Sequence, residues 1–202
     1  MGKQWIQIPR KFLEMNKGTK FVDVLVYSAI DNQKDSTTNT SNIGMRTIAE
    51  KYNIPLSKVE DAIKRLKDEG YIDYTQFPSQ NHKDRVYNQY TFPLIKKDGN
   101  IDGGYLKLKP EVLTQTLKPK DRGILIYLQL IALPNMNDIV ETKIEDIASR
   151  LGITRQTTSK YLKYFLSIDQ ITKGRHFYKC KYLAKEGAPD KKNDRKECVI
   201  IL

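Results

Sequence analysis

Long apolar segments are missing from this chain of 202 residues. The longest, residues 124–133, spans ten positions and includes a glutamine, whereas a helix that crosses a membrane needs about 20 apolar residues. The first ten residues contain no apolar region of the kind found in secretory signals. We therefore expect a protein that resides in the cytoplasm and has no membrane partner.

Cysteine and histidine are scarce as well. The two cysteines, Cys180 and Cys198, and the two histidines, His82 and His176, lie at no spacing typical of a zinc site or a disulfide framework. The glycine-rich loops that bind nucleotides and the Gly-x-Ser-x-Gly turn of hydrolases are also absent. We expect no metal, no cofactor, no catalytic residue and no enzymatic activity.

Basic residues, in contrast, are in excess. The chain has 35 lysines and arginines against 24 acidic residues, which gives a net charge of +11. A positive excess of this size favours a polyanionic partner such as nucleic acid. Hydrophobic residues make up 39 % of the chain, which is enough for packed cores and excludes a wholly disordered protein.

The two halves of the sequence resemble each other. Residues 5–8 (WIQI) align with residues 105–108 (YLKL), and with one residue removed the alignment continues from 48–54 (IAEKYNI) onto 147–153 (IASRLGI). Because apolar positions match in order along both halves, the sequence predicts two copies of one fold.

The repeat also defines the predicted domains. The first domain is expected at 1–95 and the second at 105–185, joined by a linker at 96–104 that is rich in Gly, Asp and Asn. A charged tail follows at 186–202 and ends in four apolar residues. This end could fold back onto its own chain, or it could bind a protein partner or a second copy as a homodimer.

Each copy predicts the same elements in the same order, so the expected fold class is mainly α with small β-hairpins, in two tandem domains. A short strand precedes a helix with apolar residues at helical spacing, two short helices joined by a turn, and a strand–loop–strand segment. The last strands are expected at 71–76 and 85–92 in the first copy, and at 171–173 and 176–183 in the second.

The second short helix of each copy has a start signal and an inward stripe. Ser57 followed by Glu60 predicts a capping box, and Thr154 is the expected cap in the second copy. Helical spacing places one stripe of each helix inward, namely Val59, Ile63 and Leu66 in the first copy and Thr158, Leu162 and Phe165 in the second.

Helix, helix, turn, helix and hairpin is the order of a winged helix-turn-helix domain. The run 47–72 resembles winged-helix transcription regulators, with Ala49 in the first short helix, Asn53 at the turn and Gly70 before the first wing strand. In the second copy the helix and turn residues match, but Asp169 replaces the glycine. Two such units in one chain also resemble the replication initiators of plasmids and phages.

The resemblance implies sequence-specific binding of double-stranded DNA, in the cytoplasm, on the nucleoid or on plasmid or phage DNA. A transcription regulator is the leading interpretation, and a plasmid or phage replication initiator is the alternative. A third interpretation, from another class, is a winged-helix adaptor that binds proteins. Glu60 and Asp61 favour this third interpretation for the first copy, because carboxylates on a DNA-reading helix repel phosphates.

The predicted DNA contacts lie on the second short helix and the hairpin of each copy. Residues 154–185 contain eight basic residues and one acidic residue, whereas residues 55–97 contain eight basic and six acidic ones, so the second copy is expected to supply more affinity. Arg and Gln suit guanine and adenine, while Ser, Thr and Lys suit phosphates. The candidates are Arg155, Gln156, Thr157, Ser159, Lys160, Lys163, Lys173, Arg175, Lys179 and Lys181, with Ser57, Lys58, Lys64, Lys83 and Arg85 in the first copy. The tyrosines, Tyr164 among them, are assigned mostly to core and strand positions.

Overall fold

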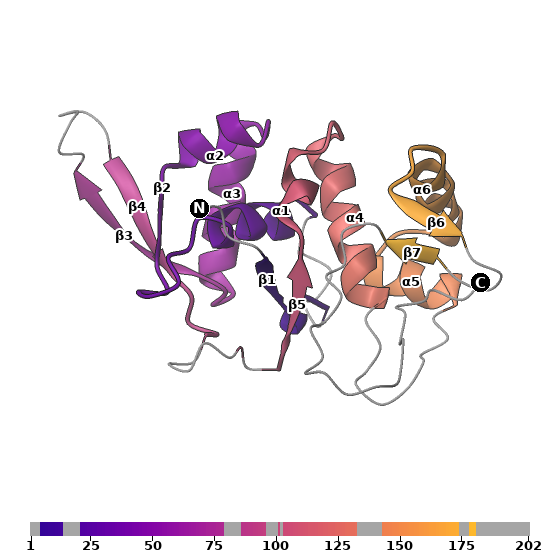
Figure 1. Cartoon of the computed structure of the whole chain (residues 1–202), viewed down its shortest axis with the longest axis horizontal. Helices are drawn as coiled ribbons and strands as arrows, with labels where there is room; N and C mark the ends of the chain where they lie inside the picture. Colours follow the sequence, from indigo (N-terminus) through magenta and orange to yellow (C-terminus); the bar gives the residue numbers. More distant parts are fainter. Residues whose placement is uncertain are drawn as a thin grey trace, which may run out of the picture. The chain divides into compact units, whose positions relative to one another are not determined.

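The computed structural model describes seven parts of the chain, which are residues 5–13, 21–78, 86–95, 101, 103–132, 143–173 and 178–180. They contain six α-helices, two 3-10 helices and seven strands, so the fold is α+β (Figure 1). The strands pair in three small antiparallel sheets. The chain divides into two compact units, 1–123 and 124–202. No helix in the described ranges has the length and apolarity to cross a membrane.

Three helices form the centre of the first unit: α1 (Phe21–Asp31), α2 (Met45–Lys51) and α3 (Leu56–Asp68). Residues 23–31 of α1 are all buried, so this helix is enclosed on every side rather than along one stripe. On α3 the predicted stripe is confirmed, since Val59, Ile63 and Leu66 are buried together with Ala62.

The first unit also contains a three-stranded sheet, with the strand order β2–β4–β3 (Figure 1). The strands are β2 (Ser41–Ile43), β3 (Asp73–Pro78) and β4 (Val86–Thr91). The sequence missed β2, because a strand of three residues is too short to show an alternating pattern. It also placed β3 two residues too early: Tyr71 and Ile72 end the turn after α3, where both amides donate to the Leu66 carbonyl.

The opening strands of the two predicted copies pair with each other. Strand β1 (Ile6–Pro9) runs antiparallel to β5 (Tyr105–Leu108), with Gln7 opposite Lys107 at the centre of the register (Figure 1). A 3-10 helix follows each strand: η1 (Arg10–Leu13) and η2 (Pro110–Thr114). Residues 105–123, which the repeat assigns to the second copy, therefore lie in the compact unit that contains the first.

The second unit contains two further helices and a strand pair. The division between the units falls within α4 (Pro119–Ala132), whose residues 124–131 are all buried. After it come α5 (Ile144–Leu151) and α6 (Arg155–Ser167), and then the paired strands β6 (Ile171–Lys173) and β7 (Tyr178–Cys180). The bounds predicted for β6 are confirmed, and the rest of the predicted 176–183 strand lies outside the described residues.

The turn between the two short helices has the same geometry in both units. Asn53 and Gly152, which are 99 positions apart, both adopt left-handed backbone, with φ of 48° and 63°. In each turn the next amide donates back to an alanine carbonyl in the first helix, over 2.9 Å to Ala49 and 3.0 Å to Ala148. These hydrogen bonds satisfy carbonyl groups at the C-terminal ends of α2 and α5.

The ends of α3 and α6 correspond as well. Both helices have 13 residues. Gly70 and Asp169 follow them with φ of 73° and 56°, so the aspartate that replaces the expected glycine takes up the same left-handed conformation. The amides of Tyr71 and Gln170 then donate to carbonyls of α3 and α6 over 2.8 and 2.9 Å.

Candidate nucleic-acid interface

Helix α6 has one buried and one exposed face. Thr158, Leu162 and Phe165 are buried, which confirms the predicted stripe. The structure brings six of the predicted contact residues together on the remaining surface of the helix. Arg155, Gln156, Lys160 and Lys163 are exposed there, and Thr157 and Ser159 are half-buried.

The start of α6 is fixed by its cap. The Thr154 hydroxyl accepts a hydrogen bond from the Thr157 amide over 3.2 Å, so the predicted cap is confirmed. Beside it, Arg155 forms an ion pair with Glu145 of α5, with 3.0 Å between Nε and Oε1. These two side chains are 71 % and 53 % exposed, and an ion pair so open to water contributes little stability. Arg155 is therefore held near the helix start but can exchange its partner for another anion.

Tyr164 belongs to the exposed surface of α6, whereas the tyrosines as a group were expected mostly at core and strand positions. Its side chain is 40 % exposed, and its ring lies 5.5 Å from the ring of Phe165. The spacing could have predicted this exposure, because Tyr164 is four residues after Lys160 and therefore lies on the same side of the helix.

Helix α3 has a lower net positive charge than α6. Ser57, Lys58 and Lys64 are exposed, as predicted, but so are Glu60 and Asp61. The whole of α3 carries four basic and three acidic residues, whereas α6 carries three basic residues and no acidic one. The charge asymmetry that the sequence indicated is thus present between the two helices themselves.

The capping box predicted at Ser57 is wrong. The helix begins at Leu56 with Pro55 as its N-cap, and no side chain caps it. The Pro55 carbonyl instead accepts from the Lys58 and Val59 amides, over 2.9 and 3.1 Å. Ser57 consequently lies inside the first turn, two positions after the N-cap.

Two of the basic residues of α3 form ion pairs with carboxylates of the same unit. Arg65 donates two hydrogen bonds to the buried Asp23 carboxylate of α1, over 2.8 and 2.6 Å, and this pairing raises the pKa of Arg65. Lys67 pairs over 2.8 Å with Asp73, which raises the lysine pKa and lowers the aspartate pKa. Lys58 and Lys64 remain as the α3 cations without an ion pair among the described residues.

The structure describes only some of the predicted contact residues on the hairpins. Lys173 and Lys179 lie on the paired strands β6 and β7, so the structure brings their backbones into one hairpin. The other predicted hairpin contacts lie outside the described residues, and these are Arg175, Lys181, Lys83 and Arg85.

An uncharged cross-strand row on the β2–β4–β3 sheet was not predicted. Asn42 and Thr75 are exposed on either side of the half-buried Gln89, and all three align in one cross-strand row. Towards the end of the hairpin, the rings of Phe77 and Tyr87 stack at 5.6 Å. The row was missed because β2, which supplies Asn42, was missed.

Within the described part of the chain, no group of three or more His, Cys, Asp or Glu side chains is placed to hold a metal ion. The surface of α6 combines cations, amide and hydroxyl groups and one aromatic ring. Comparison of this chain with protein-family models, with curated proteins and with solved structures gives no match.

Proposed function

We propose that this chain binds double-stranded DNA in a sequence-specific manner and acts as a transcription regulator. The observation that carries the proposal is the exposed face of α6, which presents Arg155, Gln156, Lys160 and Lys163 with no acidic residue on the helix. A helix with a buried apolar face and a basic polar face has the shape and charge that fit a major groove.

The order of the elements supports this proposal. In the first unit, β2 precedes α2 and α3 and pairs with the second strand of the hairpin that follows them, as expected of a winged helix-turn-helix domain. The second unit has a helix, a turn, a helix and a strand pair in the same order. The matching left-handed turns at Asn53 and Gly152 favour two tandem copies of that domain.

The proposed roles follow from side-chain chemistry. Arg155 and Gln156, at the N-terminal end of α6, suit bidentate hydrogen bonds to guanine and adenine edges. Lys160 and Lys163 supply charge for phosphates along the helix, and the strand pair β6–β7 adds Lys173 and Lys179 for the DNA backbone. The positive end of the α6 dipole adds to this attraction at the helix start.

The test is a titration of the protein with a random pool of duplexes and then with the selected sequence, at two salt concentrations. We expect affinity to fall as salt rises, because bound phosphates release counterions. Replacement of Arg155 or Gln156 by alanine should relax sequence preference, while Lys173→Ala should weaken all duplexes alike. Absence of duplex binding, or binding that is insensitive to salt, would overturn the proposal.

A matched pair of variants distinguishes a DNA contact made by α6 from the general effect of removing one positive charge. Lys163 and Lys64 are 99 positions apart and occupy equivalent positions in α6 and α3, and both are exposed. We expect Lys163→Ala to reduce the salt slope by about 1, as loss of one phosphate contact does, and Lys64→Ala to change it less. If the two changes were equal, the asymmetry between the helices would have no part in binding.

The selected sequence also separates a regulator from a replication initiator. Both would bind duplex DNA by the same residues, and they differ in where the site lies. Single or paired sites at promoters would favour the regulator, and clustered repeats of the site at an origin would favour the initiator.

One observation favours a protein partner for the first unit. Glu60 and Asp61 are exposed on α3, and the row of Asn42, Gln89 and Thr75 on the adjoining sheet carries no charge. An adaptor function predicts a partner that stays bound after nuclease treatment and is lost when Glu60 and Asp61 are replaced by lysine. Loss of the partner with nuclease would show that DNA bridges the two proteins.

A further inference from the structure

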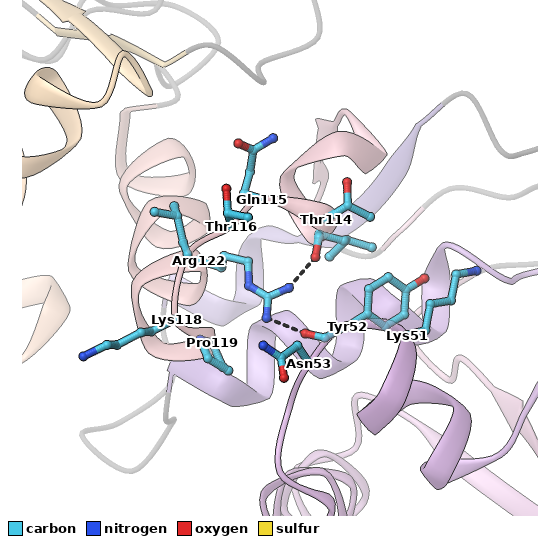
Figure 2. Close-up of a pocket in the computed structure, with 11 residues that line it drawn as sticks. Lys51, Tyr52, Asn53, Thr114, Gln115, Thr116, Lys118, Pro119 and Arg122 are labelled. Atoms are coloured by element: carbon cyan, nitrogen blue, oxygen red, sulfur yellow. Dashed lines mark hydrogen bonds between the residues drawn. The ribbon is translucent and has the colours of Figure 1, made fainter.

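An open cleft of about 410 Å³ lies in the first unit, where the end of α2 faces η2 and the start of α4 (Figure 2). Its wall on the α2 side is formed by Lys51, Tyr52 and Asn53. The opposite wall is the segment from Leu113 to Pro119, and Arg122 of α4 completes the lining. The predicted DNA contacts include none of the residues that line this cleft.

The lining is basic. Three of its residues are cations, Lys51, Lys118 and Arg122, and none is acidic. The remaining polar groups are hydroxyls and amides, which donate hydrogen bonds as readily as they accept them. Lys51 and Lys118 are exposed at the rim, and the Lys51 ammonium lies 5.5 Å from the centre of the Tyr52 ring. Both lysines can therefore move towards a bound anion at little cost.

Arg122 places a buried positive charge beneath this rim. Its side chain is 2 % exposed, and its two terminal nitrogens donate to the carbonyls of Leu113 and Tyr52 (Figure 2). Its Nε has no hydrogen-bond partner among the described residues. Burial lowers the pKa of Arg122, and no carboxylate in the described ranges opposes that effect. A buried charge of this kind normally has an anionic partner.

The start of α4 adds to the positive potential. The Lys118 carbonyl accepts from the Asp121 and Arg122 amides over 3.0 and 3.1 Å, which places the N-terminal end of a 14-residue helix at the cleft. The positive end of a helix dipole attracts anions. Asp121 is acidic and lies in the first turn, but it does not line the cleft.

We propose that this cleft is a binding site for a phosphate group. The two rim lysines would hold the oxyanion directly, and the buried Arg122 charge would attract it from below through a medium of low dielectric constant. Asn53 lies three residues before the first residue of α3, so a phosphate bound here would flank that helix. The phosphate could belong to a DNA backbone or to a free phosphate-bearing ligand. Binding of the group itself does not depend on DNA recognition by α6.

The test is a titration of the full chain with inorganic phosphate at constant ionic strength, with chloride as the reference anion, followed by NMR of the amides at 52–53 and 114–118. We expect shifts confined to these amides, and a dissociation constant raised about tenfold in Lys118→Ala. Lys120→Ala is the matched control, because Lys120 is an exposed lysine of the same helix start that does not line the cleft. Absence of these shifts, or an equal loss in both variants, would overturn the inference.

Duplex titrations of the same two variants identify the source of the phosphate. Weaker binding of every duplex by Lys118→Ala, with Lys120→Ala unaffected, would assign the phosphate to the DNA backbone. Unchanged duplex binding alongside lost phosphate binding would assign it to a free ligand. Duplex binding that needs Lys163 while the cleft takes no phosphate would overturn this inference alone. Phosphate binding without any duplex binding would overturn the proposed function alone.

Discussion

Two arginines of the first unit, the half-buried Arg65 and the buried Arg122, meet different partners. Arg65 makes a bidentate pair with the Asp23 carboxylate, whose side chain is 1 % exposed. Within the described ranges, Arg122 has only the carbonyl oxygens of Leu113 and Tyr52 as hydrogen-bond partners. The first arrangement is complete within the protein and joins α1 to α3. The second leaves a net positive charge, which is why it and not the first suggests a ligand.

Replacement of Asp23 by asparagine should destabilise the protein strongly. The amide keeps the size of the side chain but leaves the Arg65 charge without its counterion, and breaking a buried pair in this way costs about 3 kcal/mol. The free energy of unfolding in urea measures the loss. Asp73→Asn is the control, since the Asp73–Lys67 pair is exposed and its loss should cost far less. Equal losses would show that burial of the Asp23 pair is unimportant.

Gly123 is expected to tolerate no side chain. A Cβ at this position would lie 2.0 Å from the Phe21 carbonyl oxygen, so the backbone of α1 would have to move. Alanine favours a helix by about 1 kcal/mol over glycine, but the overlap should reverse this and give a net loss of about 3 kcal/mol. In contrast, Gly44→Ala places its Cβ 3.5 Å from Thr47 Oγ1 and should cost less than about 1 kcal/mol. Thermal unfolding of both variants tests the difference.

At the scale of the elements, the starts of α3 and α6 differ in how they are capped. Thr154→Ala removes the hydrogen bond to the Thr157 amide and should cost about 1 kcal/mol. Ser57→Ala removes a hydroxyl that caps nothing and should leave stability nearly unchanged. Urea unfolding curves of the two variants measure the two losses in the free energy of unfolding. A larger loss for Ser57→Ala would mean that the capping box does form in solution.

The sequence predicted the helices well because their inward residues recur at helical spacing. Thr158, Leu162 and Phe165 are buried as expected, and so are Val59 and Ile63. Short elements and shared surfaces were harder to predict. The three residues of β2 carry no period, and the pairing of β1 with β5 depends on contacts far apart in the chain.

The sequence predicted the polar and basic residues of the candidate interface, but not every residue that is exposed there. The exposed residues of α6 follow from its period, whereas the exposure of Tyr164 was missed because the tyrosines were treated as one group of mostly core and strand residues. The cleft at Arg122 could not be predicted. It brings together residues 51–53, 113–119 and 122, which share no motif and meet only in the folded protein.

At the scale of the whole molecule, we expect stability to fall at alkaline pH. Burial raises the pKa of Tyr90 to about 12 and that of Tyr27 well above its ordinary value of 10.0. Below about pH 10 both tyrosines are neutral whether the chain is folded or not, so the contribution to stability is constant. Above about pH 10 the unfolded chain loses these protons first, so stability decreases as pH rises towards the folded pKa values.

Urea unfolding between neutral pH and about pH 11 measures this decrease. The variant Tyr27→Phe should make it shallower, because one of the two raised pKa values is gone. The change should cost little at neutral pH, since the Tyr27 hydroxyl is buried with no hydrogen-bond partner among the described residues. A decrease as steep in the variant as in the original chain would contradict the assignment of Tyr27.

The pairing of β1 with β5 has a consequence for how the chain is made. Residues 6–9 leave the ribosome early, but their partner at 105–108 follows only after all of residues 10–104 have been synthesised. Until then β1 presents an open hydrogen-bonding edge, and edges of this kind promote association between nascent chains. A fragment that ends at 95 would keep that edge open permanently. The boundary suggested by the repeat is therefore a poor place to cut the chain, and we expect such a fragment to aggregate.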